Sequence, residues 1–332
     1  MSNLTCASVE DRNRLESLNL VISQFVELTA AVVTLSFTYS AVRLMLKKSI
    51  LQWSTKILLL QSLFYANLYQ LAYGLEASVL LFSLKLFMSH ETCELLQTEA
   101  HCAPYLQVLL GSTSGIIYGQ TGLMVERTCA TFLNSYKKRK SKIIGFSIAL
   151  VVFICSVCTG TFLMWNDPLD GAVLGCFMFP KQSAANSVVY FSVCTFLILF
   201  NFAISILLKI YNKKFEFSTR YEITARFRKR EAIDSTGTVC FLAFSLFVLM
   251  LIYSIGVSVL RHLLHTHALE SKDFYFYIVW IYTVPFIAML LPLLLIYRIR
   301  VAHVNRVQLL IGCTLEKQSQ ESHINQMKNM WK

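Results

Sequence analysis

Residues 238–260 read TVCFLAFSLFVLMLIYSIGVSVL and contain no Asp, Glu, Lys or Arg. A helix rises about 1.5 Å per residue, so roughly 20 apolar residues cross the ~30 Å hydrocarbon core of a bilayer. This stretch therefore predicts a membrane-spanning helix. Blocks of similar length recur along the chain, and we expect spans at about 22–42, 57–81, 104–125, 143–164, 187–208, 238–260 and 274–297.

The composition agrees with a membrane protein of one domain. The 332 residues are 55% hydrophobic and only 15% charged, whereas a soluble domain carries about 25% charged residues. The predicted fold class is therefore an all-α membrane protein, a bundle of seven transmembrane helices over residues 22–297. Residues 1–21 are polar and do not resemble a signal peptide, so the first span acts as its own anchor.

The Lys and Arg residues predict the orientation of the bundle. Of the 30 Lys and Arg residues, 24 fall in the loops and tail on one side of the seven spans, and 6 fall on the other side. Cytoplasmic loops are rich in Lys and Arg. We therefore expect the N-terminus outside and the C-terminus inside, and the net charge of +11 indicates membrane topology rather than a nucleic-acid partner.

Two features of the segments placed outside agree with this orientation. Asn3-Leu4-Thr5 is a glycosylation sequon, so Asn3 is a candidate acceptor. Cysteines on this side lie where disulfides persist, and four of them allow three pairings. We favour Cys102–Cys176, which would tie the third span to the second outer loop, with Cys6–Cys93 as the second pair.

Motifs for enzymatic chemistry are absent from the sequence. There is no HExxH, GxSxG, GxGxxG or P-loop pattern, so we expect no enzymatic activity and no cofactor. His262, His265 and His267 form a short cluster between the last two predicted spans. Solvated loop histidines explain it better than a metal site, because zinc sites show paired Cys and His spacings.

The intracellular side carries two candidate features for coupling to a partner. Glu126-Arg127 closes the third predicted span, where an acid–base pair can hold a helix end and release it when the bundle rearranges; one more cytoplasmic cation is the simpler alternative. The connection before the sixth span is basic and free of Pro, and we expect it to extend that span as a helix. Its candidate coupling residues are Arg226, Arg228, Lys229 and Arg230.

Candidate residues for a ligand pocket lie in the outer halves of the spans. A charge inside the membrane usually faces the bundle interior, so Glu76 is a candidate to contact a cationic ligand, with an internal hydrogen bond as the alternative. Glu27 lies close to the start of its span, where it can reach the headgroups. The other candidates for the pocket are Tyr105, Gln107, Tyr253, Tyr277 and Trp280.

The last span and the tail complete the predicted organisation. Pro285 and Pro292 predict kinks in the seventh span. We expect a short juxtamembrane helix over 298–313, whose last residue, Cys313, is a candidate for palmitoylation; an unmodified tail cysteine is the alternative. Residues 314–332 are polar, without an apolar period, and are expected to be disordered.

Several segments give the chain a specific resemblance. CASVEDRNRLESLNLVISQF near the N-terminus, MVERTCATF after the third span and RYEITARFRKREAIDSTGTV before the sixth are similar to the nematode serpentine receptor class alpha family of chemoreceptors. That resemblance implies a G-protein-coupled receptor in the plasma membrane of chemosensory neurons and their sensory cilia. In this reading Arg127 takes the place of the arginine that contacts the G protein, and Glu126 is its ionic neighbour.

The partners follow from this reading. They are the lipid bilayer, a small-molecule ligand such as an odorant or another soluble cue, a heterotrimeric G protein, and a second receptor in a homo- or heterodimer. Rhodopsin-like details do not transfer, because the seventh span reads PLLLIY over 292–297 rather than NPxxY. The alternative functions are a small-molecule transporter, which would often show internal repeats, and a ligand-gated channel, which would have its N-terminus inside.

Overall fold

The computed structural model describes residues 17–47, 51–87, 97–133, 138–173, 175–176, 179–180, 183–218, 223–266 and 271–330. Within these residues the chain is almost entirely helical. Its elements, in chain order, are α2 (Leu18–Lys47), α3 (Trp53–Phe87), β1 (Gln97–Thr98), α4 (Glu99–Phe132), α5 (Lys138–Leu163), β2 (Ala172–Val173), α6 (Ser183–Ser218), α7 (Ile223–His265), α8 (Ser271–Ile281) and α9 (Val284–Met330).

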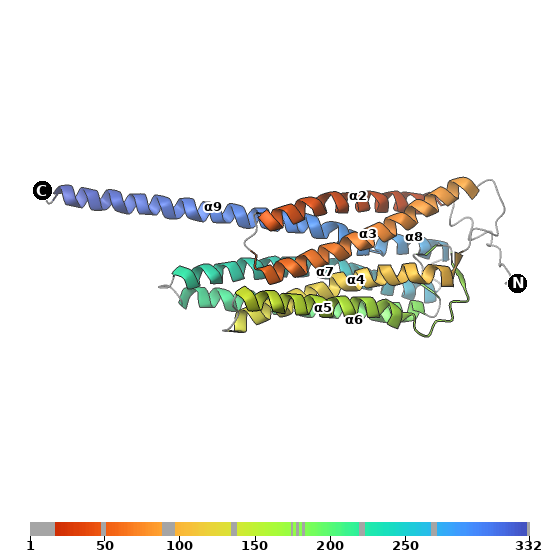
Figure 1. The fold of residues 1–332 in the computed structure, drawn as a ribbon. Helices are drawn as coiled ribbons and strands as arrows, with labels where there is room; N and C mark the ends of the chain where they lie inside the picture. The colour runs from red at the N-terminus through yellow and green to blue at the C-terminus, as the bar shows by residue number, and fades with distance from the viewer. Residues whose placement is uncertain are drawn as a thin grey trace.

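The long helices lie side by side and run between two ends of an elongated bundle (Figure 1). One end carries the antiparallel pair of β1 and β2, with Gln97 opposite Val173, together with the Cys102–Cys176 disulfide. We call it the disulfide end. The other end carries the C-terminal part of α4 and is called the Arg127 end. Beyond the Arg127 end, α9 continues out of the bundle (Figure 1).

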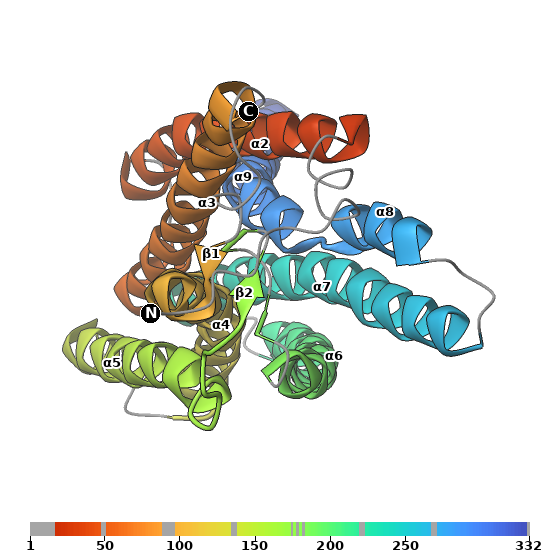
Figure 2. The ribbon, with the colours of Figure 1, turned by 90° about the vertical axis from the view of Figure 1, so that its right-hand side faces the viewer.

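Helix α4 occupies the centre of the bundle, where it packs against α3, α5, α6 and α7 (Figure 2). Its residues 112–117 are buried without interruption. Successive residues of a helix point about 100° apart, so such a run means that α4 is enclosed on every side. Three of these residues are polar, and the hydroxyls of Ser112, Thr113 and Ser114 each donate to a carbonyl one turn earlier in their own helix.

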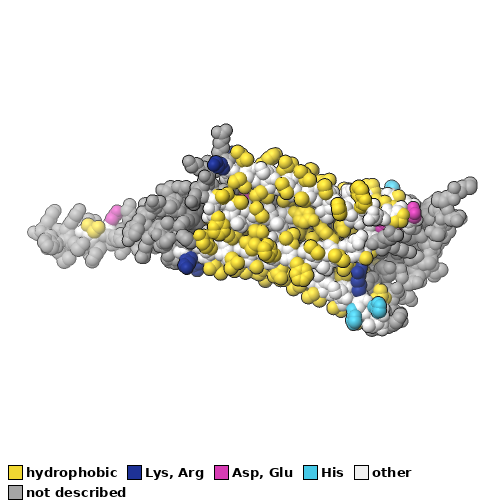
Figure 3. Space-filling view, turned by 90° about the horizontal axis from the view of Figure 1, so that it is seen from below, with side chains coloured by type: hydrophobic (Ala, Val, Ile, Leu, Met, Phe, Trp, Pro, Cys, Tyr) yellow, Lys and Arg dark blue, Asp and Glu magenta, His cyan; other side chains and the backbone are white. Residues whose placement is uncertain are grey.

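The outward-facing helices supply an apolar surface. Among the described residues, helical segments long and apolar enough to cross a membrane are 18–47, 140–163, 183–214, 232–265 and 276–305. Hydrophobic side chains form a broad band around the middle of the molecule, with the described charged side chains near its margins (Figure 3). Residues 112–117 of α4 are enclosed by other helices, and this explains why the middle of α4 tolerates Ser, Thr and Gly.

The predicted seventh span is divided in two. Helix α8 ends at Ile281, and α9 begins at Val284. Pro285 explains the break, because its ring would clash with the carbonyl of the residue four positions earlier, Ile281, and it has no N–H to donate. The sequence predicted a kink here, and the structure has an interruption. At Pro292 the helix continues.

The C-terminal region also differs from the expectation. A separate helix over 298–313 and a disordered tail over 314–332 were predicted, whereas α9 runs as one helix from Val284 to Met330. The physical reason is the composition of residues 300–330, which contain neither Pro nor, apart from Gly312, any Gly to end a helix. The side chain of Cys313 lies outside what the structure describes.

Candidate functional site

The Arg127 end contains a buried ion pair between neighbouring residues of α4. Arg127 is 1% exposed and Glu126 is fully buried. The guanidinium meets the carboxylate in a two-pronged arrangement, with Nε 2.6 Å from Oε2 and Nη2 2.5 Å from Oε1. Adjacent side chains on a helix do not face each other, so the arginine has to fold back along its own helix to make this pair.

Side chains from two other helices hold the pair in this position. Glu126 accepts hydrogen bonds from Ser54 (2.5 Å) and Thr55 (3.2 Å) in the first turn of α3. Ser141 of α5 in turn donates to Ser54, at 2.9 Å. Arg127 Nη2 donates to Gln52, which precedes α3. The pair therefore joins α3, α4 and α5, and a displacement of α3 would remove three of its hydrogen bonds.

The packing at this point is tight. A Cβ atom built on Gly145 of α5 would lie 2.6 Å from the Cα atom of Ser54, so α5 and α3 approach each other through a glycine. Arg127 keeps one unused donor, because Nη1 is buried and has no hydrogen-bond partner within the described part of the chain. In this arrangement the guanidinium is enclosed and not displayed at the surface.

The other predicted coupling residues lie on the N-terminal part of α7. That helix begins at Ile223, so the connection before the sixth predicted span does continue it as a helix. The backbones of Arg226, Arg228, Lys229 and Arg230 belong to this extension, and their side chains lie outside the described part of the structure.

A small apolar pocket, with a cavity volume of about 30 Å³, lies between the two ends of the bundle. It is lined by residues of α3, α4, α7 and α9, with polar groups from Ser62, Gln120 and Ser245. Gln120 donates across the helix interface to the Val239 carbonyl of α7.

Aromatic side chains gather between this pocket and the disulfide end. Tyr69 and Tyr73 stack on each other on α3, with ring centroids 5.7 Å apart. Tyr282, in the break between α8 and α9, packs against Tyr73 and receives a hydrogen bond from the Tyr69 hydroxyl at 3.1 Å. Tyr253 of α7 meets the Tyr282 ring edge to face. We call Tyr69, Tyr73, Tyr253 and Tyr282 the tyrosine cluster.

Polar contacts fix the break beside this cluster. Thr283 donates to the Leu249 carbonyl of α7 at 2.8 Å. Gln70 of α3, which is fully buried, donates through Nε2 to the Pro285 carbonyl at 2.7 Å. Carbonyls near an interrupted helix need such partners inside a membrane, and these two bonds attach the break to α3 and α7.

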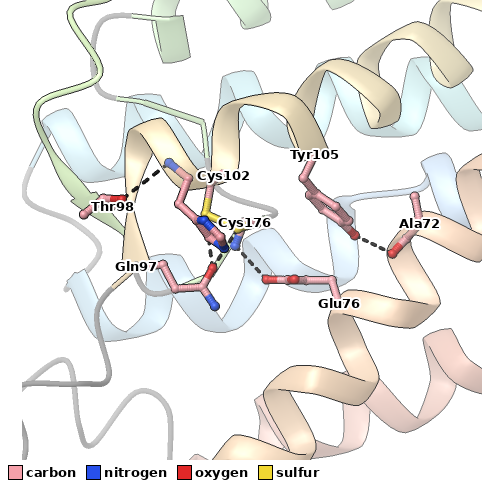
Figure 4. Close-up of a disulfide and its surroundings, with 8 residues drawn as sticks. Ala72, Glu76, Gln97, Thr98, Cys102, Tyr105 and Cys176 are labelled. Carbon is pink, nitrogen blue, oxygen red and sulfur yellow. Dashed lines mark hydrogen bonds between the residues drawn. A yellow bond between two sulfur atoms is a disulfide. The ribbon is translucent and has the colours of Figure 1, made fainter.

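The disulfide end carries a group of contacts around Cys102 and Cys176, which we call the cap (Figure 4). The disulfide joins Cys102, near the start of α4, to Cys176, and so the favoured pairing of these two cysteines is confirmed. Glu76 of α3 accepts a hydrogen bond from the Cys176 N–H at 2.8 Å. Tyr105 of α4 donates to the Ala72 carbonyl at 2.6 Å. The cap is thereby attached to α3 as well as to α4.

The six predicted pocket residues do not form one group. Tyr253 belongs to the tyrosine cluster, and Tyr105 and Glu76 lie close to it under the cap. Gln107 is exposed on α4, where Gly160 of α5 comes within contact distance of its backbone. Tyr277 and Trp280 are also exposed on α8, and the Trp280 ring N–H donates to Asn19 at the start of α2.

Sequence reasoning missed several residues of this region. Tyr69 and Tyr73 are four positions apart, a spacing that places both on one face of a helix, and Tyr282 precedes Pro285 by three positions. Glu27 was expected to reach the headgroups, but it is only 7% exposed and faces the bundle interior. The free-energy cost of exposing a carboxyl group to lipid inside a membrane span would have predicted that Glu27 faces the interior.

The remaining predicted residues fall at the margins of the structure. Asn3, Cys6, Cys93 and His267 lie outside the described residues. His262 and His265 are exposed near the end of α7. Among the described residues, no group of three or more His, Cys, Asp or Glu side chains is arranged to hold a metal ion.

Comparison with known proteins identifies the class. Residues 1–331 match the family described as serpentine type 7TM GPCR chemoreceptor Sra. The chain is 60% identical over 331 residues to serpentine receptor class alpha-9 of Caenorhabditis elegans, with all of both chains covered. It is 47% identical to serpentine receptor class alpha-6 and 37% identical to class alpha-1 of the same organism, with at least 99% of each chain covered.

The chain is therefore a multi-pass membrane protein of the chemoreceptor type, and it belongs to the Sra family of serpentine receptors. The resemblance inferred from the sequence is confirmed. The family is one of receptors, so it implies no enzymatic activity and lends no support to the transporter or channel alternative.

Proposed function

We propose that this protein is a chemosensory G-protein-coupled receptor. It binds a small-molecule cue from outside through its disulfide end, and it activates a heterotrimeric G protein through its Arg127 end. Seven spans place the N-terminus outside and the C-terminus inside, in the plasma membrane of chemosensory neurons. The observation that carries the proposal is the buried Glu126–Arg127 pair, held across α3, α4 and α5 at the end of the bundle where the intracellular partner docks.

The geometry of this pair fits a resting state. Arg127 is enclosed, so a G protein cannot contact its guanidinium until α3 or α5 moves. A movement that separates Ser54 and Thr55 from Glu126 leaves the carboxylate with fewer donors and loosens the arginine. Two packed arrangements of this kind behave as discrete states rather than as a continuous deformation.

A ligand shifts the balance between such states only by its differential affinity for them. The tyrosine cluster and the cap form the region on which the ligand acts, because they connect α3, α4 and α7 with the break before α9. The small apolar pocket of about 30 Å³ lies between this region and the Arg127 end. A tenfold change in the ratio of the two states requires only about 1.4 kcal/mol.

The proposal is tested by measuring signalling in a cell line with a second-messenger reporter, in which a compound library is screened for agonists. Arg127→Ala should abolish the response to any agonist found, at unchanged surface expression. Lys142→Ala is the matched control, because Lys142 is an exposed cation near the same end that stacks on Trp53, and it should leave the response intact. An agonist response that survives Arg127→Ala would overturn the coupling role of this residue.

A further inference from the structure

Glu27 and Glu76 are carboxyl groups in the half of the bundle nearer the disulfide end, and they differ in their surroundings. Glu76 accepts the N–H of Cys176 and so has a structural role in the cap. Glu27, about 14 Å along α2 from its start at Leu18, is 7% exposed. Its Oε2 atom is buried and has no hydrogen-bond partner among the residues that the structure describes.

The groups near Glu27 are aromatic rings. Helix α2 packs against α3, where Gly74 comes close to Ala31, one turn after Glu27. The carboxyl group interacts electrostatically with Tyr69, Tyr73 and Tyr282, three members of the tyrosine cluster. A buried acceptor without a donor in the described part of the chain thus lies near an aromatic cluster.

This combination selects the charge of a ligand. An anion would be repelled by the carboxylate, and a neutral apolar ligand would leave the carboxyl group buried and unpaired, which is costly. A primary ammonium group has three N–H donors and no acceptor, and a quaternary one has no N–H and pairs with a carboxylate through its charge. The faces of tyrosine rings also attract cations, organic ammonium groups in particular.

We propose that Glu27 is the anchor for the ammonium group of an amine ligand, with the rings of Tyr73 and Tyr282 beside it. This inference rests on the proposed receptor function and specifies its ligand class as protonated or methylated amines. The position is suited to signalling, because Glu27 belongs to α2 whereas Tyr282 lies in the break that begins α9. One bound cation therefore connects α2 to α9.

The binding step is tested on the purified full-length protein in lipid nanodiscs, by measuring the thermal unfolding midpoint. The probes are tetramethylammonium, choline, straight-chain alkylamines and phenethylamine, each compared with a neutral compound of the same shape, such as 3,3-dimethyl-1-butanol for choline. At least one amine should raise the midpoint by several degrees when its neutral counterpart does not. The inference is overturned if no amine raises the midpoint by more than its neutral counterpart does. It is also overturned if sodium chloride raises the midpoint equally in the wild type and does so less in Glu27→Gln.

Variants assign the effect to the carboxyl group. Glu27→Gln should weaken the apparent affinity for the amine at least tenfold, and Asp167→Asn, the matched control, whose carboxylate accepts from Ser183 at the start of α6, should leave it within about twofold. Retention of the full shift in Glu27→Gln contradicts the inference. Should Glu27→Gln fold poorly, the pair Tyr73→Phe and Tyr73→Leu carries the test, because phenylalanine keeps the ring and the amine binding and leucine removes both; equal binding by the two would contradict the inference.

A G-protein nucleotide-exchange assay on the same preparations separates this inference from the proposed function. A neutral agonist that drives exchange equally in the wild type and in Glu27→Gln would overturn the amine inference and support the receptor function. An amine that binds through Glu27 without driving exchange would support the inference and contradict the receptor function.

Discussion

Glu126 and Arg127 bond to each other although they are neighbours on one helix, where side chains diverge. Their contact depends on donors and acceptors from outside α4, namely Ser54 and Thr55 on the carboxylate and Gln52 on the guanidinium. Breaking a buried ion pair by removing one partner leaves an uncompensated charge and costs about 3–5 kcal/mol. The state in which Arg127 is enclosed is therefore sensitive to changes in any of these side chains.

Glu126→Gln should raise ligand-independent G-protein activation. The substitution leaves Arg127 buried without an anion, so it disfavours the enclosed state relative to the state in which the guanidinium reaches a partner. We expect several-fold faster basal nucleotide exchange in membranes that contain equal amounts of receptor, measured with a non-hydrolysable GTP analogue. Ser54→Ala should act in the same direction but less strongly. Basal exchange at the wild-type rate in both variants would show that the pair does not restrain the receptor.

At the scale of the helices, contacts between α3 and its neighbours position both ends of the molecule. Gly145 brings α5 onto the backbone of Ser54 at the Arg127 end. Toward the other end, Gln70 attaches α3 to Pro285 in the break before α9. Small residues allow membrane helices to approach closely, and buried polar groups then link them. Helix α3 is thus the element through which the tyrosine cluster and the ion pair communicate in the proposed mechanism.

Gly145→Ala should destabilise the bundle and disturb the ion pair. The new methyl group would lie 2.6 Å from the Cα atom of Ser54, and backbone cannot yield as a flexible side chain can. The expected cost is about 1–3 kcal/mol, visible as a lower thermal unfolding midpoint. Gly237→Ala is the control, since its Cβ would meet only the end of the Arg298 side chain at 3.2 Å. Equal midpoints for the two variants would argue against the close α3–α5 contact.

Thr283→Val tests whether the break in the seventh predicted span is held in place by its side chains. The substitution keeps the shape of the residue and removes the hydrogen bond to the Leu249 carbonyl. We expect a loss of about 0.5–1.5 kcal/mol, measured by thermal unfolding in nanodiscs. Thr29→Val is the control, because its hydroxyl bonds to its own helix at an exposed position. A loss equal to that of the control would mean that the break does not depend on Thr283.

The sequence predicted the positions of the helical segments better than it predicted which helix faces pack against one another. Gln107 and Tyr105 were assigned to one pocket, yet residues two positions apart on a helix point in nearly opposite directions, and Gln107 is exposed. Tyr277 and Trp280 do share a face, but residues 274–281 of α8 are all aromatic or aliphatic, so their pattern could not show whether that face is internal. Glu27 was placed near the headgroups because its span was started at residue 22, whereas α2 begins at Leu18.

At the scale of the whole molecule, membrane position and function follow from different features. Hydrophobic side chains cover the middle of the face seen in Figure 3, and such a surface suits the lipid of a bilayer. An apolar surface fits a bilayer in either direction, so it does not indicate the orientation. The orientation depends on the uneven distribution of Lys and Arg, and the proposed roles of the disulfide end and the Arg127 end both depend on that orientation.

Tags at the two termini should therefore be accessible on opposite sides of the plasma membrane. We expect an antibody to label an N-terminal tag on intact cells and a C-terminal tag only after permeabilisation, since 24 of the 30 Lys and Arg residues lie on the C-terminal side of the predicted topology. Asn3→Gln should also abolish any glycosidase-sensitive shift in mass, because Asn3 belongs to the predicted outer segment. An N-terminal tag labelled only after permeabilisation would place the Arg127 end outside the cell, where it cannot meet a G protein, and would favour the inverted arrangement of a ligand-gated channel.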